Sequence, residues 1–168
     1  MGDADDSTMQ LVRAKEALRQ VEQRLAAQAT TLATLETRAT SLVGWALAGL
    51  VAGGAALVTP AVPTVLAYAA AGLIAALLAS AVTAALAIAP RDWGVQGHLP
   101  RDVIGDFDES EAKFLEWLAE GLGKAAEDNR QRITDAARRL QISLLWFIAA
   151  APLGFVSGVI AWARTALD

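Results

Sequence analysis

Two long stretches without any charged residue constrain this chain more than any other feature of its sequence. Residues 39–90 form a run of 52 uncharged residues, and residues 140–163 form a second run of 24. A helix of about 20 predominantly apolar residues crosses the roughly 30 Å hydrocarbon core of a bilayer. The first run is therefore long enough for two membrane-spanning helices and a turn, and the second for one. An alanine-rich soluble helical bundle is the alternative that these runs leave open.

Two prolines divide the first run. Pro60 and Pro63 lie within four residues of each other. Proline disrupts the interior of a helix but fits its first turn, so this pair ends one helix and starts the next. We therefore predict spans at about 41–58, 64–89 and 142–163.

The sequence as a whole predicts an all-α integral membrane protein. Its three transmembrane helices are joined to a cytoplasmic helical stalk that resembles a coiled coil. The predicted segments are a heptad helix (1–40), a transmembrane hairpin (41–89), a loop (90–107), a cytoplasmic helix (108–141), a third transmembrane helix (142–163) and a tail (164–168).

The distribution of basic residues predicts the orientation. Segment 1–38 contains five Lys or Arg residues and segment 91–139 contains eight, whereas the hairpin turn has none and the tail has only Arg164. Cytoplasmic loops carry the excess of basic residues. We expect an inner-membrane protein whose N-terminus is cytoplasmic and whose C-terminus lies outside. Tryptophan favours the membrane–water interface, and four tryptophans fall near the predicted span ends: Trp45, Trp93, Trp146 and Trp162.

The N-terminal segment has a regular heptad pattern. Apolar residues at the first and fourth heptad positions form the seam of a coiled coil. Gln28 is a polar residue on this seam, where it lowers stability but fixes register or oligomer number. Packing of this helix within its own chain is the alternative. The seam positions are Leu11, Ala14, Leu18, Val21, Leu25, Gln28, Leu32, Leu35, Ala39 and Leu42.

The middle segment offers a partner for this helix. Its apolar positions recur every three or four residues, which places them on one helical face. We consider two environments for Asn129 on this stripe: a pair with Gln28, or water at the edge of the seam. Gly121 and Gly123 are the point at which this helix could break. The stripe comprises Leu115, Leu118, Leu122, Ala126, Asn129, Ile133, Ala137 and Leu140.

Few residues can support catalysis. The chain has no cysteine and one histidine, His98, which excludes disulfides, thiolate nucleophiles and histidine metal clusters. The acidic group around Asp106 lacks the spacing of a calcium loop. A formal net charge of −4 argues against nucleic acid as a partner. We expect no enzyme activity, no cofactor and no metal.

Small-residue motifs occur in two predicted spans. Gly49 and Gly53 form one GxxxG motif, and Gly154 and Gly158 form another. Such motifs let helices approach closely. The contact is made either within one protomer or between protomers, and the second possibility predicts a homo-oligomer. The predicted spans contain no ionisable side chain, which argues against an ion-coupled pump.

The helix over 11–40, the hairpin over 41–89 and the helix over 108–140 together resemble the SLATT domain of small membrane effectors in bacterial conflict systems. The third span is additional to that two-span pattern. The resemblance implies an oligomeric protein that perturbs or permeabilises the inner membrane in antiphage defence, with pore formation as one route.

Two other functions are consistent with the sequence. The chain is alternatively a structural anchor or regulatory subunit of a membrane complex, with a cytoplasmic protein partner docked on the stalk. A prophage lysis protein of the holin type is a weaker possibility, because the cytoplasmic part is large for one.

Overall fold

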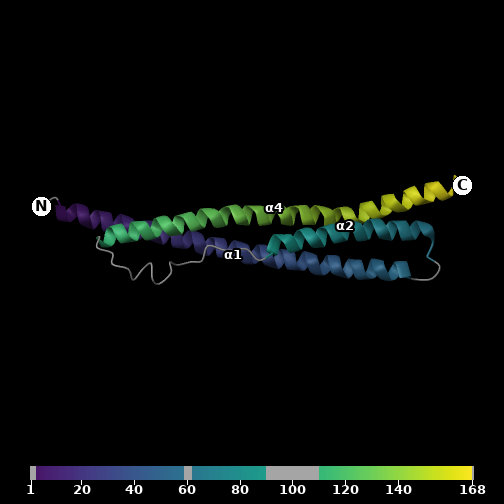
Figure 1. Ribbon diagram of the computed structural model, residues 1–168, viewed down its shortest axis with the longest axis horizontal. Coiled ribbons are helices and arrows are strands. Elements are labelled where there is room, and N and C mark those ends of the chain that lie inside the picture. Colours follow the sequence, from purple (N-terminus) through teal and green to yellow (C-terminus); the bar gives the residue numbers. More distant parts are fainter. Residues whose placement is uncertain (1–2, 59–61, 90–109, 168) are drawn as a thin grey trace. The chain divides into compact units, whose positions relative to one another are not determined.

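The computed structural model describes residues 3–58, 62–89 and 110–167, and it is helical almost throughout these ranges. Helix α1 covers Asp3–Val58, α2 covers Thr64–Ile88 and α4 covers Glu111–Thr165 (Figure 1). The predicted all-helical class is therefore confirmed. All three helices are long and apolar enough to cross a membrane, which indicates a membrane protein.

Two of the helices extend well beyond their apolar stretches. α1 continues without interruption from the heptad segment into the first predicted span, and α4 does the same into the third. α4 passes through Gly121 and Gly123 without a break, and Pro152 also lies inside it. α4 begins at Glu111, whereas the sequence placed the start at 108. The predicted loop over 90–107 lies outside the described residues.

The contacts divide the chain into two compact units. The first unit comprises Met1–Ala33 and Arg91–Thr134, and the second comprises Thr34–Pro90 and Asp135–Asp168. The first unit is therefore built from the N-terminal parts of α1 and α4. The second unit contains α2 and the C-terminal parts of α1 and α4.

The heptad pattern predicts which side chains of α1 are covered in the first unit. Between Ser7 and Ala33, every residue outside the heptad positions is exposed. The covered positions follow the seven-residue repeat because α4 packs along that face. Leu25 forms a core with Leu122 and Ala126 of α4. The covered residues are Leu11, Ala14, Leu18, Val21, Leu25, Gln28 and Leu32.

The second unit has a core of small residues. Alanine side chains from all three helices meet there, and Leu77 is the one large side chain among its buried members. Large apolar side chains point outward instead: Val51 and Phe155 are each 73% exposed. In water such an exposed apolar surface would favour aggregation, whereas lipid solvates it. The buried members of this core are Ala46, Ala76, Leu77, Ala81 and Ala150.

Candidate functional site

The membrane-spanning part of the second unit is the first candidate site, and close contact between α2 and α4 organises it. A Cβ atom on Gly154 would lie 2.9 Å from the carbonyl oxygen of Ala69, and one on Gly158 would lie 3.2 Å from the Cβ of Ala69. On the facing helix, a Cβ on Gly72 would lie 3.0 Å from the carbonyl oxygen of Leu153. Glycine at these positions lets the two backbones touch, as in small-residue packing of membrane helices.

The other predicted motif packs α1 on α2. A Cβ on Gly49 would lie 2.6 Å from Cδ1 of Leu77, and one on Gly53 would lie 3.1 Å from Cγ1 of Ile74. All four glycines of the two GxxxG motifs therefore contact another helix of the same chain. Contact between protomers through these glycines remains a prediction.

A pair of serines joins α2 to α4 by reciprocal hydrogen bonds. The Ser80 hydroxyl donates to the carbonyl oxygen of Ser143 at 2.9 Å, and the Ser143 hydroxyl donates to the carbonyl oxygen of Ser80 at 2.8 Å. Both residues are completely buried. Sequence analysis did not identify this pair, because serine in an apolar run differs little in pattern from alanine. The one signal in the sequence was that Ser143 follows Leu140, the last residue of the apolar stripe, by three residues.

An arginine of α4 binds the end of α2. Nη1 of Arg139 donates to the carbonyl oxygen of Leu86 at 2.9 Å. The last four carbonyls of a helix lack partners within that helix, and a cation there also complements the helix dipole. Arg139 therefore stabilises the last turn of α2, which ends at Ile88. The sequence indicated only that basic residues gather near this end of the spans.

Three of the four tryptophans predicted at the interface lie among the described residues. The Trp45 ring contacts Phe147 of α4, with 6.3 Å between ring centroids. Trp45 is nevertheless exposed, as are Trp146 and Trp162 on α4. Trp93 lies outside the described residues. Their depth in a membrane stays a prediction.

An apolar groove of about 860 Å³ lies among the three helices of the second unit. Residues of α1, α2 and α4 all line it, those of α2 lying between Leu66 and Leu77. Apart from the indole N–H of Trp45, the lining side chains carry no hydrogen-bonding group. The lining residues are Trp45, Gly49, Ala52, Gly53, Ala56, Val62, Leu66, Ala69, Ala70, Leu73, Leu77, Phe147, Ala150, Ala151, Gly154 and Phe155.

The first unit contains the second candidate site, a polar region on the seam. Nε2 of Gln28 donates to the carbonyl oxygen of Ala126 at 2.7 Å. Asn129 is only 5% exposed, and neither its Oδ1 nor the Oε1 of Gln28 has a partner. Both environments considered for Asn129 are therefore wrong: it does not pair with Gln28, and it does not face water. α4 lies close enough for its backbone, rather than a side chain, to receive the Gln28 amide.

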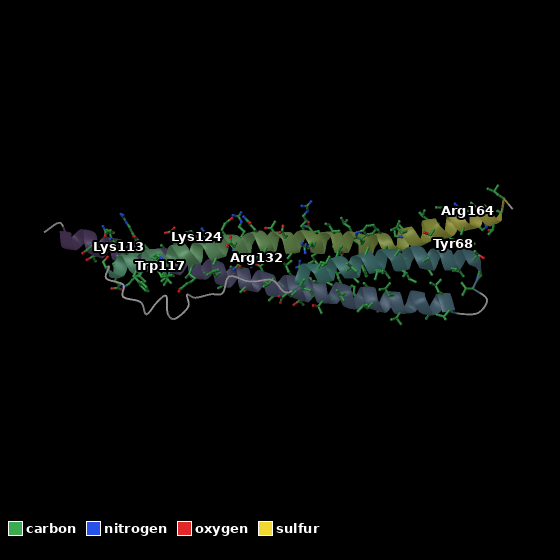
Figure 2. All side chains as sticks on the ribbon, viewed as in Figure 1. Tyr68, Lys113, Trp117, Lys124, Arg132 and Arg164 are labelled. Atoms are coloured by element: carbon green, nitrogen blue, oxygen red, sulfur yellow. The ribbon has the colours of Figure 1, made fainter. Side chains whose placement is uncertain are left out.

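A third buried atom without a partner belongs to the same unit. Nη1 of Arg132 is buried and makes no hydrogen bond; Figure 2 labels Arg132 on α4. An unsatisfied buried polar atom typically costs about 1–3 kcal/mol. The first unit thus contains two buried acceptors and one buried donor that a different packing arrangement could satisfy.

The outer faces of the first unit carry exposed ion pairs. Lys15 of α1 and Glu111 of α4 lie 3.1 Å apart. Within α1, the Arg19 side chain donates two hydrogen bonds to the Glu16 carboxylate. Together with a bond from Gln20, these bonds lower the pKa of Glu16 to about 2. Exposed pairs of this kind contribute little to stability.

The described residues contain no group of three His, Asp or Glu side chains that could hold a metal ion. His98 and the acidic group around Asp106 lie outside the described residues. No family model, curated protein or solved structure matches this chain.

Proposed function

We propose that this chain is a non-enzymatic, oligomeric protein of the bacterial inner membrane that perturbs or permeabilises the membrane in a defence system. The architecture that resembles SLATT-domain effectors supports the defence role. The membrane role is supported by three apolar helices that pack through glycines and a serine pair. The N-terminus and the first unit are cytoplasmic in this proposal, and the C-terminus lies outside.

The observation that carries the proposal is the unsatisfied polar seam of the first unit. Gln28 and Asn129 each bury an acceptor without a donor inside a single chain. A polar residue at one core position of a coiled coil typically specifies register and oligomer number by pairing across the seam. Assembly of several copies through α1 and α4 would let these amides pair with one another. In this proposal, conversion of the single-chain seam to the assembled seam is the step that activates the protein.

The seam can be tested directly in cells. Replacing Gln28 and Asn129 by Leu makes the single-chain seam apolar, which stabilises it and removes the groups that specify assembly. We expect wild-type expression in bacteria to collapse the membrane potential, measured with a potential-sensitive dye. The Gln28→Leu, Asn129→Leu variant should insert normally yet leave the potential intact, and crosslinking in membranes should show the loss of oligomers.

A matched control also replaces two side-chain amides by Leu, but outside the seam. Gln23 and Gln131 are exposed on α1 and α4 of the same unit. Gln23→Leu with Gln131→Leu should depolarise cells as the wild type does. If the seam variant depolarises cells equally well, assembly through Gln28 and Asn129 is wrong.

Harmless wild-type expression, with oligomers still present, would favour the structural anchor instead. Orientation is tested separately by fusing alkaline phosphatase to Asp168. Activity is expected outside the cell membrane, and an inactive fusion would overturn the three-span topology.

A further inference from the structure

We infer that Pro152 is a hinge in the third predicted span. Residues 153–165 of α4, which we call the distal segment, move against α2 about this hinge, while the part of α4 before Pro152 stays in place. The hinge lies within the predicted spans and does not depend on the proposed effector function.

Pro152 interrupts the backbone hydrogen bonds of α4. It lies inside the helix, which continues to Thr165. Proline has no backbone N–H, so the carbonyl oxygen of Ile148, four residues earlier, loses its usual donor. Sharp bends in long helices occur mostly at such positions, and Figure 1 shows the yellow C-terminal part of α4 at an angle to the part before it. The helix is therefore least stiff at Pro152.

A serine adds a second feature that bends helices at the same place. The Ser157 hydroxyl donates to the carbonyl oxygen of Leu153 at 2.8 Å. A serine that bonds to the carbonyl four residues earlier competes with the backbone and often bends the helix. Pro152 and Ser157 lie within about two turns of each other, so both weaken the same part of α4.

The contacts between α4 and α2 differ on the two sides of Pro152. Before it, the reciprocal bonds of Ser143 with Ser80 and the bond from Arg139 attach α4 to α2. Among the described residues, no hydrogen bond or ion pair joins the distal segment to α2. The close approach there is made by Gly154 and Gly158, which offer only van der Waals contact. The distal segment can therefore separate from α2 without breaking a hydrogen bond, whereas the part before Pro152 cannot.

Movement about the hinge changes the apolar groove of the second unit. The residues of α4 that line the groove lie on both sides of Pro152, and only those after it belong to the distal segment. The hinge therefore alters the width of the groove in one part and leaves the rest unchanged. The lining residues of α4 are Phe147, Ala150 and Ala151 before Pro152, and Gly154 and Phe155 after it.

The hinge is tested by distance measurements on the full-length protein in phosphatidylcholine nanodiscs. The chain has no cysteine, so spin labels can be attached to introduced cysteine pairs and their separation measured by double electron–electron resonance. Tyr68→Cys with Ala163→Cys reports on the distal segment and α2. Leu78→Cys with Leu145→Cys is the reference pair before the hinge. All four positions are exposed, so the labels do not disturb the core.

The expected displacement follows from the length of the distal segment. Ala163 lies eleven residues, or about 16 Å, beyond Pro152 along the helix. A rotation of about 20°, the size of a sharp proline kink, moves it by about 6 Å. In the otherwise unchanged protein, the distal pair should give distances spread over about 6 Å or more, and the reference pair a single narrow distance.

Two substitutions of Pro152 and one control isolate the cause. Pro152→Ala and Pro152→Leu both restore the backbone N–H, so each should narrow the distal distribution to one distance and leave the reference pair unchanged. Val156, an exposed residue of the distal segment, already has its N–H, so Val156→Ala should leave the distribution broad.

Three results would overturn the hinge. A single narrow distal distance with Pro152 present would show that the distal segment does not move. An equally broad distribution in both Pro152 variants would show that Pro152 does not cause the movement. A reference pair as broad as the distal pair would assign the movement to the whole of the second unit.

Discussion

Replacing Gly154 by alanine tests whether backbone contact between α2 and α4 holds the second unit together. The added Cβ would lie 2.9 Å from the carbonyl oxygen of Ala69 and 3.2 Å from the Cβ of Leu73. The oxygen belongs to a helical backbone, so the two helices must separate by a few tenths of an ångström along their contact. The neighbouring contacts at Gly72 and Gly158 loosen with them.

The expected cost follows from two opposing effects. Forcing one extra carbon into a packed core typically costs about 1–3 kcal/mol. Alanine is also the better helix former, by about 1 kcal/mol. The net loss of stability for Gly154→Ala is therefore about 0–2 kcal/mol. At Gly54, where an added Cβ has no neighbour within 4 Å, only the helix-forming gain applies, so Gly54→Ala should be neutral or stabilising by up to about 1 kcal/mol.

The assay is unfolding of the purified protein in mixed micelles with increasing SDS, followed by circular dichroism. Gly154→Ala should unfold at a lower SDS fraction than the wild type, and Gly54→Ala at the same or a higher fraction. Gly49→Ala is an informative intermediate, because its added Cβ meets only the flexible tip of Leu77 and should cost less than Gly154→Ala. Identical midpoints for Gly154→Ala and Gly54→Ala would refute the role of backbone contact.

Three further predictions concern individual polar contacts. In a double-mutant cycle of Ser80→Ala and Ser143→Ala, the same SDS assay should give a coupling energy of about 0.5–1.5 kcal/mol. As a control, Thr83, whose hydroxyl donates within α2, should show no coupling to Ser143. An uncoupled Ser80–Ser143 pair would contradict the reciprocal hydrogen bonds between these serines. Arg139→Gln should speed amide hydrogen exchange in the last turn of α2 about two- to fivefold, which corresponds to about 0.3–1 kcal/mol at a helix terminus. The control Arg138→Gln should leave the exchange rate unchanged. Equal rates in both variants would contradict the stabilisation of this turn by Arg139. The carboxyl carbon of Glu16 should titrate by NMR with a pKa of about 2, and Arg19→Ala should raise this pKa toward 4.5. Because folding lowers the pKa, the contribution of Glu16 to stability is complete above pH 4.5 and is lost as the pH falls through 2; a wild-type midpoint near 4.5 would contradict the Arg19 contact.

The heptad repeat predicted the covered face of α1 well but not its partner. Leu11, Leu18, Leu25 and Leu32 all lie on the covered face in the first unit. Periodicity identifies which face of a helix is buried, yet it is the same whether that face meets α4 of the same chain or a helix of another copy. The glycine motifs share this ambiguity, since GxxxG specifies close approach and not the identity of the approaching helix.

The polar contacts were harder to predict because they depend on distances that a sequence pattern does not contain. Asn129 was expected to pair with Gln28 or to face water, and it does neither. Which atom receives the Gln28 amide depends on how closely α1 and α4 approach, and Ala126 brings the α4 backbone within 2.7 Å of Nε2. The groove is lined by residues of three helices, so no single segment of the sequence encodes it.

The distribution of unsatisfied atoms suggests which part of the molecule rearranges. Within the described ranges, the three buried side-chain atoms without partners belong to Gln28, Asn129 and Arg132, all in the first unit. In hydrocarbon such an atom costs several kcal/mol because no water can replace the missing partner, and the buried hydroxyls of the second unit are paired accordingly. The closed seam of the first unit leaves its three atoms unpaired, and they gain partners only when the seam opens. Opening there therefore recovers hydrogen bonds, whereas opening between Ser80 and Ser143 loses them. For this reason, a conformational change that starts in the first unit costs less free energy than one that starts among the predicted spans.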